Sequence, residues 1–203
     1  ADINFYNKIS DTDFRKLSWK APAGSVLEGK NTYIDTATGA ALPEYASLKF
    51  RPGSGNMSDF NVGSACSYPM MRVEEMYFIE AEAAAQQNPA QGVNLLNDFM
   101  SNYRDPQYKC TKSSKEDVVK EIVFQKRVEL WGEGQSFFDI KRLNLPVTRG
   151  YAGTLHHTIG RFNTTTRPAW MNFCIVRSEG NNNTALVGFE NPDPSDVYSS
   201  WAE

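Results

Sequence analysis

The chain has 203 residues, of which 40% are apolar and 22% charged, a composition typical of a folded globular protein. Its formal net charge of -3 argues against a nucleic-acid binder, whose affinity depends on lysine and arginine contacts to phosphates. No window approaches the roughly 18 to 20 apolar residues of a membrane-spanning helix, and the N-terminus lacks a signal-peptide layout. These features indicate one domain, or a large part of one, that is either cytoplasmic or without its targeting segment.

The first third of the chain, residues 1–68, is rich in glycine, proline, serine, threonine and asparagine. It contains short β-like runs around Tyr33 and from Tyr45 to Phe50, and no convincing helix after an opening turn. We therefore expect an irregular, loop-rich segment before the first long helix.

From Pro69 onward the apolar residues recur at intervals of three and four, which predicts a helix from about Met71 to Gln87. Asn88-Pro89 ends this helix and favours a second one from Ala90 to about Tyr103. Two helices joined by so short a connection must pack antiparallel. The stripe that gives the first helix its period consists of Val73, Met76, Tyr77, Glu80, Ala83 and Ala84.

A second helical hairpin follows. Ser113 or Ser114 can cap a third helix that ends at Trp131-Gly132, and a short fourth helix is expected from Gln135 to Leu143. Two successive hairpins resemble a tetratricopeptide-type stack, although their spacing is longer than the regular repeat. Residues 146–203 return to polar, coil-like sequence with one strand-like run, Trp170 to Val176.

The sequence thus predicts a mainly α protein of tetratricopeptide-like helical hairpins, with long irregular loops and a few short strands. We interpret the chain as part of a single domain, with residues 69–145 forming the hairpins. Residues 1–68 and 146–203 are expected to be irregular, the latter packed on the helices.

Charged residues lie beside or between the apolar positions of the helices, where an ordinary amphipathic helix would keep them apart. We expect them to form a partly buried ion network that ties the third helix and its corner to the first helix. The alternative is a hydrolase acid and base, but the neighbouring arginines lower carboxylate pKa values and disfavour a general acid. The residues of the predicted network are Arg72, Glu75, Arg127, Glu129, Glu133, Asp139 and Arg142.

No metal or cofactor site is predicted. The adjacent histidines His156 and His157 would point to opposite faces of an extended segment, a poor arrangement for one metal ion. The three cysteines lie far apart with no CxxC pair, a spacing that does not fit a zinc site.

Two motifs resemble those of a known family. MRVEEMYFIEAEAA, from Met71 to Ala84, is similar to the R-x-x-E-x-Y-L-I-x-A-E-A helix of the SusD/RagB family. QKRVELWGEGQSFFDIKRL, from Gln125 to Leu143, is similar to the family's E-R-x-x-E-L-x-x-E-G-x-R-x-x-D-L-x-R segment. They occur in the family's order, with a matching Leu96-Asn97 between them.

The resemblance implies a SusD-like helical fold and a non-catalytic outer-membrane lipoprotein exposed at the cell surface, of which this chain would be the C-terminal part. Such a protein binds a glycan or another nutrient and delivers it to a SusC-like TonB-dependent transporter. Its contact with the membrane would be only through a lipid anchor outside this chain. By residue type and loop position, the candidate ligand-binding aromatics are Trp19, Tyr33, Tyr45, Tyr151 and Trp170.

Two other functions stay open at this point. The hairpins could be a helical-repeat module that binds only another protein, in which case the helix faces carry the contact. Alternatively the chain could be a glycosidase that depends on Glu129 or Glu133.

Overall fold

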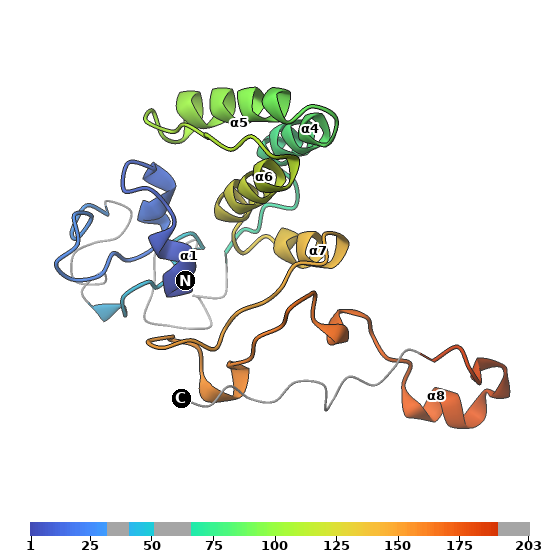
Figure 1. Ribbon diagram of the computed structural model, residues 1–203. Helices are drawn as coiled ribbons and strands as arrows, with labels where there is room; N and C mark the ends of the chain where they lie inside the picture. Colours follow the sequence, from blue (N-terminus) through green and yellow to red (C-terminus); the bar gives the residue numbers. More distant parts are fainter. Residues whose placement is uncertain (32–40, 51–65, 191–203) are drawn as a thin grey trace. The chain divides into compact units, whose positions relative to one another are not determined.

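A computed structural model describes residues 1–31, 41–50 and 66–190 of the chain. Within these ranges the regular secondary structure is almost entirely helical, with long irregular connections, and the only β structure is two isolated bridges, Trp19 with Ser47 and Thr148 with Asn163 (Figure 1). The chain divides into two compact units, Ala1–Gln135 and Ser136–Glu203. The prediction of a mainly α protein is confirmed.

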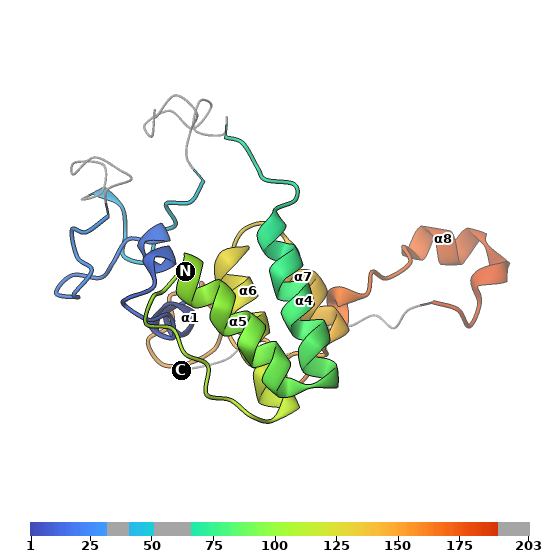
Figure 2. The ribbon, with the colours of Figure 1, turned by 90° about the horizontal axis from the view of Figure 1, so that it is seen from above.

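The first unit is built around an antiparallel helical hairpin, α4 (Val73–Gln87) and α5 (Pro89–Tyr103) (Figure 2). Asn88 is both the C-cap of α4 and the N-cap of α5, and its side chain accepts a hydrogen bond from the Ala90 N–H at 3.1 Å. Pro89 occupies the first position of α5, where a missing backbone N–H costs nothing. The hairpin and its boundaries therefore agree closely with the sequence prediction.

The buried face of α4 is not the predicted stripe. The residues that α4 buries are Phe78, Ala81, Glu82 and Ala85. At 100° per residue this face lies opposite the stripe that begins at Val73, which is 65% exposed. Both sides of α4 carry apolar residues, so residue spacing alone could not distinguish the side that meets α5 and α6 (Lys115–Glu129).

Gly92 on α5 explains how closely the two helices of the hairpin approach. A Cβ atom at this position would overlap the Cβ of Ala85 and crowd the carbonyl oxygen of Ala81. The small residues on the buried side of α4 therefore face a residue with no side chain at all.

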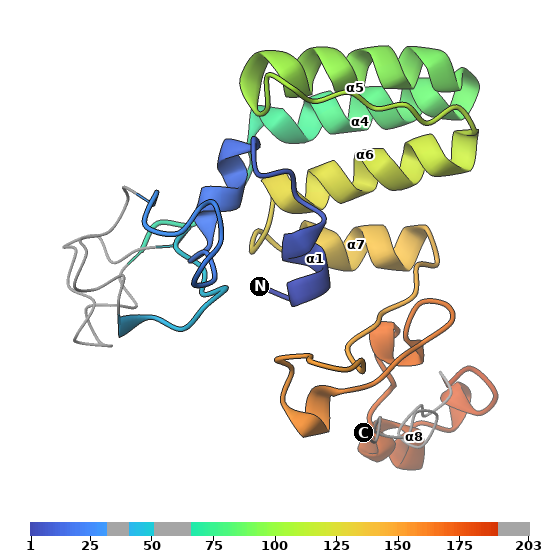
Figure 3. The same cartoon turned by 60° about the vertical axis from the view of Figure 1, so that its left-hand side comes forward.

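Helix α6 packs beneath the hairpin (Figure 3). Ser114 caps its N-terminus by accepting a hydrogen bond from the Asp117 N–H at 3.2 Å. The sequence predicts an apolar stripe of Val118, Ile122, Val123 and Val128 on this helix, and all four are buried. The helix packs with α4 and α5 around side chains that are almost fully enclosed. These enclosed side chains include Phe78, Leu96, Met100, Val118 and Ile122.

A second cluster joins the N-terminal segment to the end of α6. It contains α1 (Ile3–Asn7) and the short 3-10 helix η1 (Phe14–Ser18), which the sequence did not predict beyond an opening turn. Trp19 is central, with edge-to-face contacts to Phe5 and to Trp131 at centroid distances of 5.7 and 5.8 Å. The irregular N-terminal segment thus contributes its own aromatic core.

The second unit contains most of α7 (Gln135–Arg142) and several short helices. These are η2 (Thr158–Gly160), η3 (Ala169–Met171), α8 (Arg177–Asn182) and η4 (Thr184–Leu186).

Two expectations for this unit were wrong. The run from Trp170 to Val176 forms no strand, because η3 takes its first residues and no partner strand pairs with it among the described residues. The stretch from Asn181 to Thr184, which its asparagines predict to be a loop, is instead partly helical, since α8 and η4 cover it. The side chain of Asn183 caps η4 by accepting a hydrogen bond from the Ala185 N–H at 3.2 Å.

Candidate functional site

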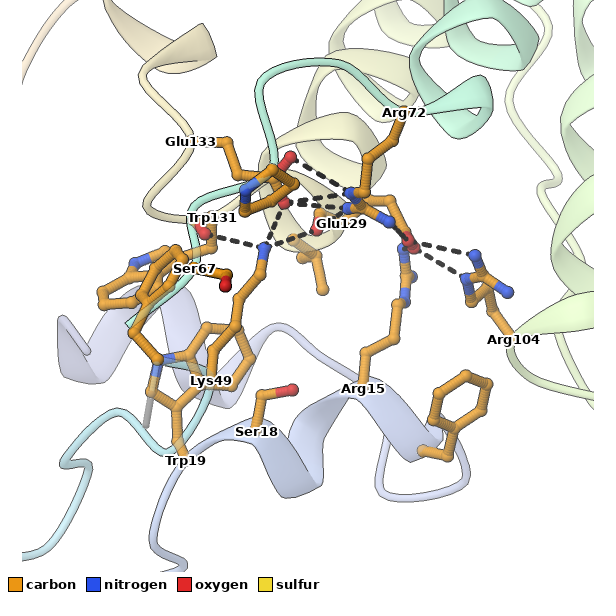
Figure 4. A pocket seen from close by; sticks show the side chains of 14 residues that line it. Arg15, Ser18, Trp19, Lys49, Ser67, Arg72, Arg104, Glu129, Trp131 and Glu133 are labelled. Atoms are coloured by element: carbon orange, nitrogen blue, oxygen red, sulfur yellow. Dashed lines mark hydrogen bonds and ion pairs between the residues drawn. The ribbon is translucent and has the colours of Figure 1, made fainter. Parts of the chain in front are cut away.

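A pocket of about 410 Å³ lies in the first unit (Figure 4). This volume is within the range of roughly 300 to 1,000 Å³ that is usual for small-molecule sites. One part of its lining is ionic and another part is aromatic. The ionic residues are Arg15, Lys49, Arg72, Arg104, Glu129 and Glu133, and the aromatic residues are Phe14, Trp19, Phe50 and Trp131.

Glu129 is the centre of the ionic part. Its carboxylate accepts hydrogen bonds from Arg104 Nε at 2.7 Å, Arg72 Nη1 at 3.0 Å and Arg15 Nη1 at 3.2 Å. Burial by itself raises the pKa of Glu129, but the hydrogen bond from Arg104 and the charge of Arg15 lead the opposing effects, which lower it to about 2. Glu129 is therefore ionised at any physiological pH.

Glu133 forms the second centre. Arg72 donates to it from Nε, at 3.1 Å to each carboxylate oxygen, and from Nη2 at 2.9 Å. Lys49 donates to the same carboxylate and to the carbonyl oxygens of Glu129 and Trp131, at 3.1 and 2.8 Å. Burial lowers the pKa of Lys49, against the opposing effect of Glu133. All three ammonium hydrogens of Lys49 therefore have acceptors.

Two further carboxylates complete the network. Asp13 Oδ2 accepts from Arg15 Nη2 at 2.6 Å, while Glu74 pairs with Arg104 at 3.0 Å and with Arg72 at 3.3 Å. Four cations and four carboxylates are thus joined, and their formal charges cancel. The cations are Arg15, Lys49, Arg72 and Arg104, and the carboxylates are Asp13, Glu74, Glu129 and Glu133.

The network gathers three helix ends. Arg104 is the C-cap of α5, and Arg72 is the N-cap of α4. The carbonyl of Glu129, the last residue of α6, accepts from Lys49 and from Arg72 Nη2 at 2.7 Å. Cations are favourable at helix C-termini, whereas Glu74 supplies the negative charge that the N-terminus of α4 prefers. The same residues that line the pocket therefore fix the relative positions of α4, α5 and α6.

The aromatic part of the pocket continues into a row of three rings. Phe50 is tilted by 32° from Trp131 at a centroid distance of 6.4 Å, and by 31° from Tyr68 at 5.0 Å. Gly132, with φ of +79°, leaves room for Phe50, because a Cβ atom there would overlap Cε2 of that ring. Tyr68 lies between the lining residues Ser67 and Pro69 and is 62% exposed.

The structure brings Arg72, Glu129 and Glu133 of the predicted ion network together. The remaining predicted members make other contacts. Glu75 accepts a long hydrogen bond from Gln135 at 3.5 Å, and Arg127 lies over the ring of Phe5 at 4.7 Å. In the second unit, Asp139 and Arg142 pair with each other within α7 at 2.8 Å.

The predicted ligand-binding aromatics of the first unit have different surroundings. Trp19 lines the pocket but is only 1% exposed, because packing by Phe5 and Trp131 encloses it, and its contact with a ligand stays a prediction. Tyr45 is half-buried against Tyr6 at 5.1 Å, with an unusual φ of 63°. Tyr33 lies outside the described residues.

Tyr151 and Trp170 belong to the second unit. Trp170 is an exposed ring that meets Phe162 edge to face at 4.7 Å, and Tyr151 is half-buried. Their contact with a ligand stays a prediction.

Several lining residues escaped the sequence analysis. Arg15 and Lys49 lie in irregular sequence, where no periodicity marks a buried position, and Arg104 directly follows the predicted second helix. A helix-end rule could have found Arg104, because cations favour C-termini. Phe50 and Tyr68 carried no local signal, since their partners are distant in sequence.

The chemistry of the pocket does not favour acid–base catalysis. A general acid needs a raised pKa, whereas arginines hold the pKa of Glu129 at about 2. Among the described residues no group of three or more histidine, cysteine or acidic side chains could hold a metal ion. None of the described helices is long and apolar enough to cross a membrane. The fold and pocket together define a helical scaffold whose pocket is lined in part by a closed network of ion pairs.

Comparisons with known proteins identify the family. The sequence profile of the SusD family matches residues 18–191, and the chain belongs to this family. A similar solved structure is a SusD-like carbohydrate binding protein from Bacteroides vulgatus, with 25% sequence identity and a TM-score of 0.61. The match covers 98% of this chain but 43% of the other, so the chain spans less than half of that protein's length. No curated protein matches the chain.

Proposed function

We propose that the protein binds a glycan or another nutrient at the cell surface and delivers it to a TonB-dependent outer-membrane transporter. The observation that carries this proposal is the SusD-family match over residues 18–191. The similar structure from Bacteroides vulgatus, described as a carbohydrate binding protein, supports the ligand class. A lipid anchor would hold the protein at the outer membrane.

The proposal includes no catalytic step. Glu129 and Glu133, the two carboxylates a glycosidase would need, both accept multiple hydrogen bonds from cations. If the chain were a glycosidase, Glu129→Gln or Glu133→Gln would abolish release of reducing sugar from oligosaccharides. We expect no such release from the unaltered chain.

Ligand binding can be tested by isothermal titration calorimetry with a panel of plant and host oligosaccharides. We expect at least one to bind with an affinity between about micromolar and millimolar. No heat of binding across the panel would overturn the glycan proposal.

Delivery to a transporter is tested separately, by purifying the tagged full-length protein from its own outer membrane. Recovery of a TonB-dependent transporter supports this step. A preparation that contains glycan-binding protein but no transporter would reject delivery while leaving binding intact.

A second candidate is a helical-repeat module that binds only another protein. The exposed side of α4 favours it, because Val73, Met76 and Ile79 are exposed there. On this alternative, substitutions such as Met76→Glu would abolish co-purification of a protein partner, and no oligosaccharide would bind.

A further inference from the structure

We infer that the pocket in the first unit holds an uncharged sugar ring, stacked on the aromatic row formed by Phe50, Tyr68 and Trp131. The inference rests on the proposed function and deepens it by assigning a site and a ligand class. It places ligand contact on residues other than the aromatics expected from the sequence.

The aromatic row has the form of a stacking platform. Its rings are inclined to their neighbours by 31° and 32°, and Tyr68 stacks on Phe50 at a centroid distance of 5.0 Å, so Tyr68 forms the outer end of the row. Tyr68 is 62% exposed and Trp131 is half-buried, so ring surface remains accessible. The C–H face of a sugar ring is apolar and packs on such rings, which bury a large area at little conformational cost.

The platform is held in place before any ligand binds. Phe50 fits against Gly132, where any side chain would collide with the ring. Lys49, the residue before Phe50, donates to the carbonyl oxygen of Trp131 at 2.8 Å. Phe50 and Trp131 are thus joined through a partly buried hydrogen bond of the intervening Lys49, which reduces the entropy lost on binding.

Two hydroxyl groups are available for hydrogen bonds to a sugar. Ser18 and Ser67 line the pocket, as Figure 4 shows, and neither side chain has a hydrogen-bond partner within the described part of the chain. A serine hydroxyl both donates and accepts, which suits the hydroxyl groups of a sugar.

The ionic part of the pocket argues for an uncharged ligand. The guanidinium groups of Arg15 and Arg72 already donate from all three nitrogens to carboxylates, carbonyls or Gln125. Lys49 has three acceptors, and the network is neutral overall. A uronate or sulfate would have to displace internal carboxylates to find a cationic partner, whereas a neutral sugar needs none.

The inference predicts which oligosaccharides bind. The uncharged probes are maltohexaose, cellohexaose, xylohexaose and mannohexaose, and the charged probes are hexagalacturonate and a chondroitin sulfate hexasaccharide. Each is titrated into the unaltered chain by calorimetry, with tryptophan fluorescence as a second readout because Trp131 lines the pocket. We expect binding of at least one uncharged probe and none of the charged ones.

The site is tested with matched tyrosine variants. Tyr68→Ala removes a ring that stacks on the lining residue Phe50 at 5.0 Å and 31°, while Tyr77→Ala removes one that stacks at 5.1 Å and 31° on Phe99, which does not line the pocket. Tyr68→Ala should weaken binding by about tenfold or more, the size expected of an aromatic anchor. Tyr77→Ala should leave the affinity unchanged, and thermal unfolding of each variant shows that it is folded.

Failure of the site, of the ligand class and of the glycan function would each give a different result. Uncharged binding that survives both Tyr68→Ala and Phe14→Ala would overturn the site and leave the proposed function standing. Binding of charged probes alone would overturn the ligand class. Absence of binding by every probe would overturn the inference together with the glycan function on which it rests.

Discussion

The ionic and aromatic parts of the pocket differ in the groups that they leave free to contact a ligand. In the ionic part, Glu129 and Glu133 are surrounded by cations whose hydrogens are directed at protein acceptors. In the aromatic part, Tyr68 exposes most of its ring, and nearby hydroxyls have no partner within the described chain. The comparison indicates that the charged residues hold the helices in place, while the accessible surface that our proposal assigns to a ligand lies in the aromatic part.

The largest effect on stability should come from removing the central carboxylate of the ion network. Glu129→Ala leaves Arg15, Arg72 and Arg104 without their shared carboxylate, and unpairing a buried charge network costs about 3 to 5 kcal/mol. Urea unfolding should therefore show a much lower free energy of unfolding.

The matched control for this variant is Glu116→Ala, which breaks an exposed pair with Lys120 on the same helix. It should unfold like the unaltered chain, since exposed pairs contribute little. Equal stabilities for the two variants would mean that the ion network does not stabilise the folded chain.

Acid should weaken the ion network over a defined pH range. The pKa of Glu129 in the folded chain, about 2, is below its ordinary value of 4.5. Its stabilising contribution, ~3 kcal/mol, is therefore complete above about pH 4.5 and is lost as the pH falls towards 2. The gap in unfolding free energy between the unaltered chain and Glu129→Gln should shrink over this range, and a constant gap would contradict the assignment.

Two glycine substitutions separate the packing of Phe50 against residue 132 from the backbone cost of a positive φ. Gly132 and Gly134 have φ of +79° and +84°, but only Gly132 faces a neighbour, the ring of Phe50. Gly134→Ala should cost about 1 kcal/mol from the backbone alone, and Gly132→Ala should cost about 1 to 3 kcal/mol more. Equal losses in thermal unfolding would show that Phe50 moves aside freely.

The smallest effect on stability is expected at the exposed end of the aromatic row. Tyr68→Ala should leave the melting temperature nearly unchanged, because most of this ring is already in water. A large fall in melting temperature, measured by circular dichroism, would assign Tyr68 to the core instead of to a binding surface.

Helix boundaries were the most predictable part of the fold. Asn88-Pro89 and Ser114 act locally, through caps and the fixed φ of proline, so they marked helix ends before any tertiary contact was known. The packed side of α4 was not predictable, because apolar residues occupy both sides and only the positions of α5 and α6 choose between them.

The candidate site, like the fold, was predictable only in part. The sequence alone determined the family, and its predicted network of seven charged residues included the three central ones, Arg72, Glu129 and Glu133, because they belong to continuous helical motifs. Only the tertiary structure joined them to Arg15, Lys49 and Arg104, and set Phe50 between Tyr68 and Trp131. Contacts between irregular segments far apart in sequence leave no periodic trace, since they depend on where loops meet the ends of helices.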